Sequence, residues 1–318
     1  MDFSGFYGNR SAKAALSAWI DEDRLPQAII IQGDRGCGKR TLAARLAQAC
    51  VCTAQPRSAR PCGRCAACQK SMTGGHPDVM RVEGGDRPRS FGVELVRAVR
   101  ADVNILPNEA ARKVYILAQA HNMTEQAQNA LLKILEEPPA YAVFILTAES
   151  ALQLLPTVRS RAALVSLSGA DEADAVRACA ALCPRASDAE LHAAAALWDG
   201  NIGRMAESLS EGMLPRAQAL CDKVPDALLA PAETALLTLT APLIADRALC
   251  RAVCGILRAQ LTAALAGRNS PFGGRLAPEP LARCAEAAEN TLRAMDRFAN
   301  QTLIVTRLCA QMRHAVGK

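Results

Sequence analysis

A run of glycines that ends in a lysine is the first feature of this sequence that could do chemistry. Residues 33–39 read Gly-Asp-Arg-Gly-Cys-Gly-Lys, directly after an apolar run and directly before a helical pattern. In that setting glycines let backbone N–H groups turn inward around phosphate oxygens, and the lysine reaches the terminal phosphates. We therefore expect a phosphate-binding loop that could hold ATP or ADP. The expected phosphate contacts are Gly33, Gly36, Gly38, Lys39 and Thr41.

The position after the lysine departs from the usual form of such a loop. A Ser or Thr there would bind Mg²⁺ through its hydroxyl. The sequence has Arg40 instead, and a hydroxyl comes one position later, at Thr41. A guanidinium cannot coordinate a cation, so Mg²⁺ is a poor fit even where the loop still holds phosphate.

The acidic half of an ATP-hydrolysing site is also missing. Hydrolysis needs a carboxylate that helps to hold the metal and a second group that polarises the attacking water, both at the end of a neighbouring strand. The strand expected over residues 113–117 is followed by Ala118 and Gln119, neither of which carries a charge. His121 is better explained as a helix-start or core histidine than as a base. We do not expect ATP hydrolysis in this site.

Four cysteines form the second chemical pattern. Cys62, Cys65 and Cys68 follow one another at intervals of three, and Cys52 precedes them. Four thiolates suit Zn²⁺ in a closed tetrahedron, which makes a structural site and not a catalytic one. Reduced free cysteines and an iron–sulfur cluster are the weaker alternatives. Cys50 lies two residues from Cys52, so the identity of the fourth ligand stays open.

These patterns need an α/β frame to position them. Nearly continuous Val, Ile and Leu runs predict strands of a parallel sheet that is covered on both faces. Between two of the runs, residues 124–137 predict a helix that is capped by Thr124 and stopped by Pro138. The expected strands are Ala28–Gln32, Asp78–Glu83, Lys113–Ala118, Ala142–Thr147 and Ala163–Leu167.

The strand signals fade after about residue 169, which predicts a division into three parts. Residues 1–168 form the α/β domain, with the cysteine module at 50–68. Residues 169–212 read as short helices with a break at 199–201, and residues 213–318 read as a helical bundle.

Composition limits the classes of protein that fit. Half of the residues are hydrophobic and 3% are aromatic, and the formal net charge is +6. This mildly basic balance is compatible with nucleic acid nearby but lacks the aromatic platforms of a single-strand binder. No run of 18 or more apolar residues and no signal peptide stand in the sequence. We expect a cytoplasmic protein that has no membrane partner.

Together these features resemble one family. Residues 129–139 read Asn-Ala-Leu-Leu-Lys-Ile-Leu-Glu-Glu-Pro-Pro, and residues 156–161 read Pro-Thr-Val-Arg-Ser-Arg. With the phosphate loop and the four cysteines in the same order, the chain resembles bacterial DNA polymerase III clamp-loader subunits of the AAA+ class. The resemblance implies a P-loop AAA+ domain of RecA-like fold, then a helical lid and a helical collar that joins subunits in a ring.

The resemblance also assigns roles to single residues. Arg161 matches an arginine that projects into the ATP site of an adjacent subunit, where a guanidinium stabilises charge on the transferred phosphoryl group. Thr147 occupies the sensor 1 position of the family. At the sensor 2 position the chain has Gly203, with Arg204 next to it. An arginine kept for a neighbour, together with a defective site of its own, is typical of the delta-prime type.

This reading implies a set of partners and leaves two competing hypotheses. The partners are the gamma/tau and delta subunits, the sliding clamp through the assembly, and primed DNA through the ring. The chain would be a component of a DNA-directed DNA polymerase, a nucleotidyltransferase, without ATPase activity of its own. The first alternative is a gamma/tau-type ATPase with its own activity, and the second is a zinc-dependent nucleic-acid-binding module.

Overall fold

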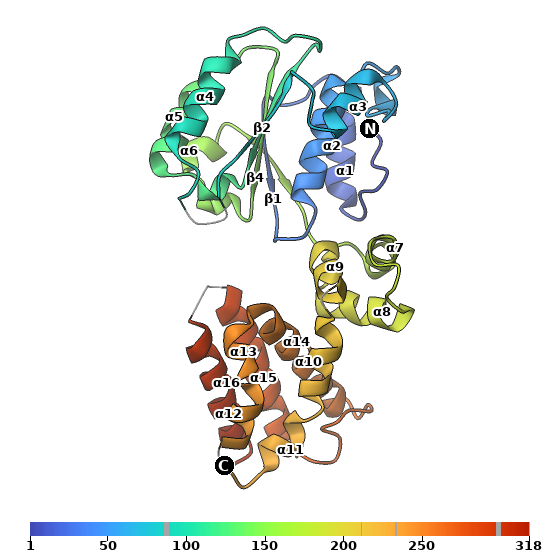
Figure 1. The fold of residues 1–318 in the computed structure, drawn as a ribbon, viewed down its shortest axis with the longest axis vertical. Coiled ribbons are helices and arrows are strands. Elements are labelled where there is room, and N and C mark those ends of the chain that lie inside the picture. The colour runs from blue at the N-terminus through green and yellow to red at the C-terminus, as the bar shows by residue number, and fades with distance from the viewer. Residues whose placement is uncertain (86–88, 211, 233, 297–299, 318) are drawn as a thin grey trace. The chain divides into compact units, whose positions relative to one another are not determined.

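The chain forms two compact units in a computed structural model, which describes residues 1–85, 89–210, 212–232, 234–296 and 300–317 (Figure 1). The first unit comprises Met1–Ala178 and Asp199–Arg204, and the second comprises Cys179–Trp198 and Met205–Lys318. Residues of the expected lid, 169–212, therefore contribute to both units. The division into three parts at about residues 168 and 212 stays a prediction.

A five-stranded parallel sheet is the frame of the first unit. Its strands are β1 (Ala28–Gln32), β2 (Val79–Glu83), β3 (Lys113–Ala118), β4 (Ala142–Ala148) and β5 (Ala163–Ser166). They lie in the order β2-β3-β4-β1-β5, and every pair is parallel. The predicted parallel sheet is confirmed, and no strand end differs from its expected position by more than one residue.

Burial explains why these segments form strands. Every residue of β3 and of β4 is buried. Such strands need apolar side chains on both faces, and this is the origin of the continuous Val, Ile and Leu runs. Among them, the rings of Tyr115 and Phe144 stack at 5.2 Å between centroids. The middle of the sheet is therefore covered by apolar side chains on both faces.

Helices cover the two faces of the sheet (Figure 1). One face carries α1 (Arg10–Asp21), α2 (Lys39–Val51) and α3 (Ala66–Met72). The other carries α4 (Val93–Val103), α5 (Glu125–Glu136) and α6 (Pro156–Arg159). Three short 3₁₀ turns connect these elements at Arg57–Ala59, Ala120–Asn122 and Ala151–Gln153.

Helix α5 shows how closely local sequence sets an element. The Thr124 hydroxyl accepts a hydrogen bond from the backbone N–H of Ala127 at 3.1 Å, which is the expected N-cap. Ala127, Leu131 and Leu135 follow at intervals of four and are buried. The predicted helix over residues 124–137 is confirmed to within one residue at each end.

The remaining helices build most of the second unit. They are α7 (Glu172–Leu182), α8 (Asp188–Leu197), α9 (Ile202–Ser210), α10 (Met213–Cys221), α11 (Val224–Leu229), α12 (Thr234–Thr240), α13 (Pro242–Ala245), α14 (Arg247–Leu265), α15 (Pro278–Asp296) and α16 (Gln301–Ala315). Among the described residues only α14 is long and apolar enough to cross a membrane, a test that core helices also pass. Helix α14 packs against α10 and α15, and Leu249, Val253 and Leu257 are buried.

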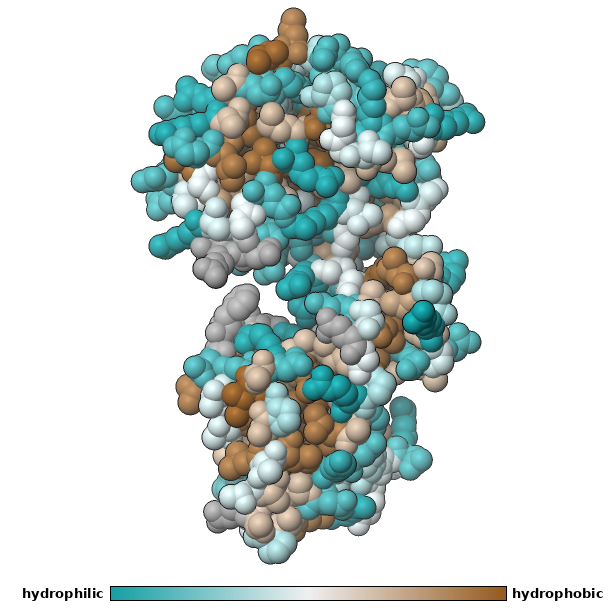
Figure 2. Space-filling view, in the orientation of Figure 1, coloured by the Kyte–Doolittle hydropathy of each residue, from teal (hydrophilic) through white to brown (hydrophobic). Residues whose placement is uncertain are grey.

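Large apolar side chains also reach the surface. Figure 2 shows them as brown areas among the hydrophilic teal residues of both units. Leu106, Leu152 and Leu303 are each at least 70% exposed. Leu152 and the half-exposed Leu164 stand on either side of Arg161 in the chain.

A buried carboxylate fixes the edge of the sheet at which β3 begins. Asp78 is 1% exposed, and its carboxylate accepts hydrogen bonds from the backbone N–H groups of Asn108 (2.6 Å), Glu109 (2.7 Å) and Ala110 (2.8 Å). Burial raises the pKa of Asp78, but the three donors outweigh burial and the net pKa lies below the ordinary value. The ionised form therefore stabilises the fold.

We predict that Asp78→Asn lowers the free energy of unfolding by about 2–4 kcal/mol at pH 7, because charge-assisted bonds to buried N–H groups are lost. A lowered carboxyl pKa contributes stability that is present above the ordinary value of 3.8 and is lost as pH falls through the folded-state pKa. The gap between wild type and variant should therefore narrow in acid. Urea unfolding over a pH series measures it, with the exposed Asp188→Asn as control. A gap that is absent at pH 7, or constant with pH, would contradict the prediction.

Candidate functional site

The predicted phosphate loop lies between β1 and α2, as expected. Gly36 and Gly38 both have φ of +91°, a conformation that favours glycine, and α2 begins at Lys39. The Lys39 ammonium donates hydrogen bonds to the carbonyl oxygens of Gly33 at 2.5 Å and Asp34 at 2.8 Å. The lysine therefore folds back on its own loop and occupies carbonyls of the loop.

The surroundings of Lys39 lower the pKa of its ammonium group. Burial lowers the pKa of Lys39, and the nearby Arg204 acts in the same direction, while Glu149 and Asp34 oppose them. Thr41, the displaced hydroxyl, is exposed on the first turn of α2. Of the expected phosphate contacts, the three glycines and Lys39 thus form the loop, and Thr41 lies on the helix beyond it.

The first turn of α9 and the residue before it lie directly on the phosphate loop. The Asn201 side-chain amide donates to the carbonyl of Arg35 at 2.9 Å, and the Gly203 N–H donates to the carbonyl of Gly36 at 3.0 Å. A Cβ at position 203 would come within 2.6 Å of the Gly36 Cα. This close approach leaves no room for a side chain at position 203, the expected place of a sensor arginine. The neighbouring Arg204 is near enough to Lys39 to depress its pKa.

An ion pair stands where a metal would be expected. The Arg40 guanidinium, one residue beyond the lysine, pairs with the Glu83 carboxylate at the end of β2. Both side chains line a small cavity of about 40 Å³ together with Ala118, the residue that replaces the missing acid, and with Arg81 and Ile116. Arg40 therefore supplies a positive charge next to the phosphate loop, and Glu83 of β2 supplies the negative charge that balances it.

The ends of β3 and β4 meet beside the loop. The Thr147 hydroxyl is buried and accepts a hydrogen bond from the backbone N–H of Gln119 at 3.0 Å. Burial lowers the pKa of His121, and the carboxylate of Glu149 opposes this effect. Nδ1 of His121 is buried and, within the described part of the chain, has no hydrogen-bond partner. That His121 is a helix-start or core histidine and not a base stays a prediction.

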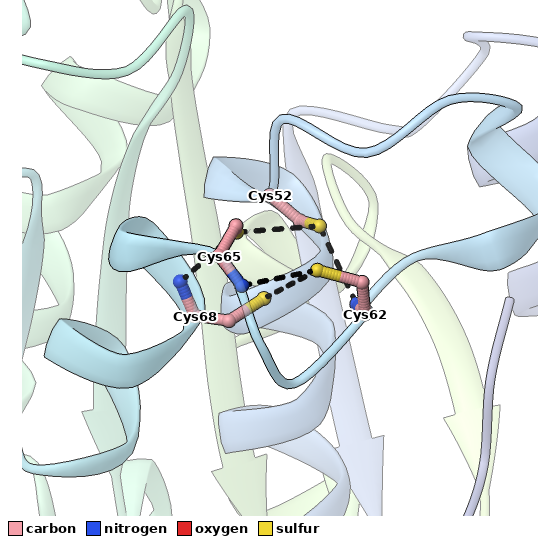
Figure 3. A group of neighbouring side chains, drawn as sticks. All are labelled: Cys52, Cys62, Cys65 and Cys68. Carbon is pink, nitrogen blue, oxygen red and sulfur yellow. Dashed lines mark hydrogen bonds between the residues drawn. The ribbon is translucent and has the colours of Figure 1, made fainter.

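The four cysteines converge on one point (Figure 3). The sulfur atoms of Cys52, Cys62, Cys65 and Cys68 all lie within 4.8 Å of one another. Two pairs, Cys52–Cys65 and Cys62–Cys68, are separated by 3.9 and 4.0 Å. Zinc–sulfur bonds of about 2.3 Å in a tetrahedron place sulfurs about 3.8 Å apart, so the geometry fits Zn²⁺. Cys50 is not part of the cluster and is buried at the end of α2.

Backbone N–H groups point at these sulfurs. Cys52 Sγ accepts from the N–H of Cys62, Cys62 Sγ from that of Cys65, and Cys65 Sγ from that of Cys68, each at 3.4 Å. Burial raises the pKa of Cys65, but backbone donors, first that of Thr53, outweigh it and lower the pKa to about 6. At Cys52 and Cys68 burial prevails, and the pKa of each lies above the ordinary value. Donors of this kind favour thiolates, the form that binds metal.

The cysteine module is tied to the sheet domain by polar contacts. Gln48 of α2 donates to the Cys68 carbonyl at 3.3 Å. Lys70 of α3 pairs with Glu109 at 2.6 Å, and Arg57 pairs with Asp23 at the end of α1. The module therefore connects α1, α2 and the segment that leads into β3.

Arg161 lies apart from the phosphate loop of its own chain, between α6 and β5. Its guanidinium contacts Glu136 at the end of α5, and its side chain is 36% exposed. Neither Glu83 nor Glu136 was singled out by the sequence as a partner of an arginine. Two features of the sequence could have pointed to these partners. Glu83 is an acid at the end of a predicted strand, and Glu136 lies in the 129–139 segment.

About half of the chain is similar in sequence to parts of known proteins. The chain is 36% identical over 159 residues to DNA polymerase III subunit gamma/tau of Mycobacterium tuberculosis, which covers 50% of this chain and 27% of the relative. It is 38% identical over 134 residues to the delta' subunit of Pseudomonas aeruginosa (42% and 40%) and 35% identical over 160 residues to that of Haemophilus influenzae (49% and 47%). The chain thus spans less than half the length of each of these relatives.

A family model covers a larger part of the chain. The model described as DNA polymerase III, delta subunit, matches residues 8–171. This range includes the phosphate loop, all four clustered cysteines, the 129–139 segment and Arg161. Since the match extends over more than half of the chain, the protein belongs to the DNA polymerase III delta subunit family.

Proposed function

We propose that this chain is a clamp-loader subunit of DNA polymerase III of the delta-prime type. It does not hydrolyse ATP and supplies Arg161 to the ATP site of a neighbouring subunit. The observation that carries the proposal is the Arg40–Glu83 ion pair, which lines one cavity with Ala118 at the place of the missing metal site. Family membership supports the replication role, and relatives named delta' and gamma/tau each match about half of the chain.

The charges of the site favour the delta-prime type over the gamma/tau type. An ATPase must hold Mg²⁺ with oxygen ligands and must activate water. Here a guanidinium stands beside the loop, Ala118 is apolar, and position 203 has no space for a side chain. Each difference removes a separate part of the machinery for hydrolysis. What the loop retains is the ability to present backbone N–H groups.

Arg161 is suited to work in another chain's site. An arginine side chain stays charged at any physiological pH and presents a planar set of donors that matches phosphoryl oxygens. Its chemistry would be to stabilise negative charge that develops on the transferred phosphoryl group. Its side chain is 36% exposed, so the guanidinium is accessible from outside the chain.

The rest of the molecule takes the roles that such an assembly requires. Residues 169–212 would act as the lid and residues 213–318 as the collar that joins the ring. The partners would be the gamma/tau and delta subunits, with the sliding clamp and primed DNA reached through the assembly in the cytoplasm. The chain would then serve a DNA-directed DNA polymerase, a nucleotidyltransferase, without chemistry in its own site.

The purified chain should release phosphate from Mg²⁺–ATP no faster than its Lys39→Ala variant, because neither protein has a Mg²⁺ site beside the phosphate loop or a water-activating carboxylate. Steady-state phosphate release measures this directly. A rate that depends on Lys39 would contradict the proposal and would favour a gamma/tau-type ATPase.

In a reconstituted loader, Arg161→Ala should slow ATP turnover at the one site next to this chain by about 10³-fold or more, since removal of an arginine finger has effects of that size. Single-turnover hydrolysis separates this site from the others. Arg97→Ala, which removes an exposed arginine paired with Glu94, is the matched control and should leave turnover unchanged. Equal rates for the two variants would exclude the trans role of Arg161.

We also propose that the four clustered cysteines hold a structural Zn²⁺. The ion would close a tetrahedron of thiolates and so hold the loop from residue 52 to residue 68 in one conformation. The support is the sulfur spacing and the set of N–H donors aimed at the sulfurs.

The purified protein should contain about one equivalent of zinc, and Cys68→Ala should lose it because three thiolates bind the ion more weakly than four. Elemental analysis gives the zinc content, and circular dichroism gives the accompanying loss of stability. Cys183→Ala, outside the cluster, should keep its zinc. Wild-type protein without zinc, or a Cys68→Ala protein that retains it, would refute the site.

A further inference from the structure

Arg161 is not free in this chain. One terminal nitrogen, Nη2, donates to the Glu136 carboxylate at 3.0 Å. The other, Nη1, donates to the Thr157 carbonyl at 3.1 Å and to the Ser160 hydroxyl at 3.4 Å. Glu136 is the last residue of α5, 25 positions away in the sequence. The fold therefore brings a carboxylate to the guanidinium from a separate element.

These contacts use three of the five N–H donors of Arg161. A phosphoryl group is best bound by parallel N–H donors of one guanidinium. With Nη1 and Nη2 already donating within the chain and a carboxylate alongside, an incoming anion would meet a partly neutralised charge and a like charge next to it. An anion can gain the full interaction with Arg161 only after Glu136 has moved away.

We propose that Glu136 is a positioning residue: the resident counter-ion of Arg161, which holds the guanidinium in place until the polyphosphate of a nucleotide in the neighbouring subunit displaces it. This inference rests on the proposed function and adds to it the group with which the nucleotide competes. The release of Arg161 from Glu136 then depends on the negative charge of the nucleotide.

The exposure of the pair sets the size of the effect. The side chains of Arg161 and Glu136 are 36% and 50% exposed, so water screens their attraction. Ion pairs of this kind change an equilibrium by at most about fivefold. A phosphate group carries more charge than a carboxylate and offers more acceptor oxygens, so it can replace Glu136. A singly charged anion has no such advantage.

Glu137 provides a matched control next to Glu136. It is exposed and, among the residues that the structure describes, makes no ion pair with Arg161. Glu136→Gln and Glu137→Gln remove the same charge from adjacent positions. A difference between the two variants therefore reports the contact with Arg161 and not the net charge of the segment.

The first arm of the test uses the isolated full-length chain and does not depend on the loader. Phenylglyoxal modifies guanidinium groups, and mass spectrometry follows Arg161 with Arg97 as an internal reference. Glu136→Gln should raise the relative rate at Arg161 by about two- to fivefold, and Glu137→Gln should leave it unchanged. Equal rates in both variants would overturn the counter-ion role, whatever Arg161 does in the assembly.

The second arm uses the reconstituted loader. Glu136→Gln should lower the KM for ATP at the adjacent site by up to about fivefold with kcat unchanged, because the competitor is lost before the transition state is reached. A fall in kcat like that of Arg161→Ala, or an unchanged KM, would refute displacement. If Arg161→Ala itself has no effect, the proposed function fails, and the modification rates still decide whether Glu136 holds Arg161.

Discussion

The parallel direction of β1, β3 and β4 is the constraint on which the functional part of this molecule depends. In a parallel sheet the carboxyl ends of all strands reach the same edge. The register pairs Ile31 with Thr147 and Leu117 with Leu146, so the phosphate loop, Ala118 and Thr147 come together from three distant segments. Ligands of open α/β sheets bind at this edge for the same reason. The buried strands fix the backbone at the phosphate loop and at positions 118 and 147, whatever side chains these positions carry.

The sheet therefore supplies the frame on which an ATPase site could be built. The difference from such a site lies in the charged side chains at the carboxyl ends of its strands. Lys39 satisfies its donors with carbonyls of its own loop, and Arg40 finds a carboxylate on β2. Groups that would face a metal and a nucleotide in an ATPase are here paired within the chain. Arg161 follows the same rule, since it too has a partner in Glu136. In all three places a cationic side chain is therefore neutralised or bound by groups of its own chain.

The sequence predicted most of the frame because strand and helix signals are local. The Thr124 cap, the spacing of Ala127, Leu131 and Leu135, and the continuous apolar strands each follow from neighbouring residues. The sequence also left two candidates, Cys52 and Cys50, for the fourth cysteine of the cluster. The structure places Cys52 there.

The long-range pairs could not be found in the same way. Arg40 meets Glu83, and Arg161 meets Glu136, only because of strand order and helix orientation. The division into units was equally hidden. Residues 199–204 pack on the phosphate loop although the helices before and after them belong in part to the other unit. Periodicity reports which face of an element is buried, but not which distant side chain it meets.

The contact between Gly36 and Gly203 also limits which residues this part of the fold accepts. A side chain at position 203 would collide with the phosphate loop, and one at position 36 would come within 2.3 Å of Asn201. A single substitution at either position would therefore force the phosphate loop away from the start of α9. The two glycines act as one unit, and a residue with a side chain can be accepted at one position only if the backbone at the other moves.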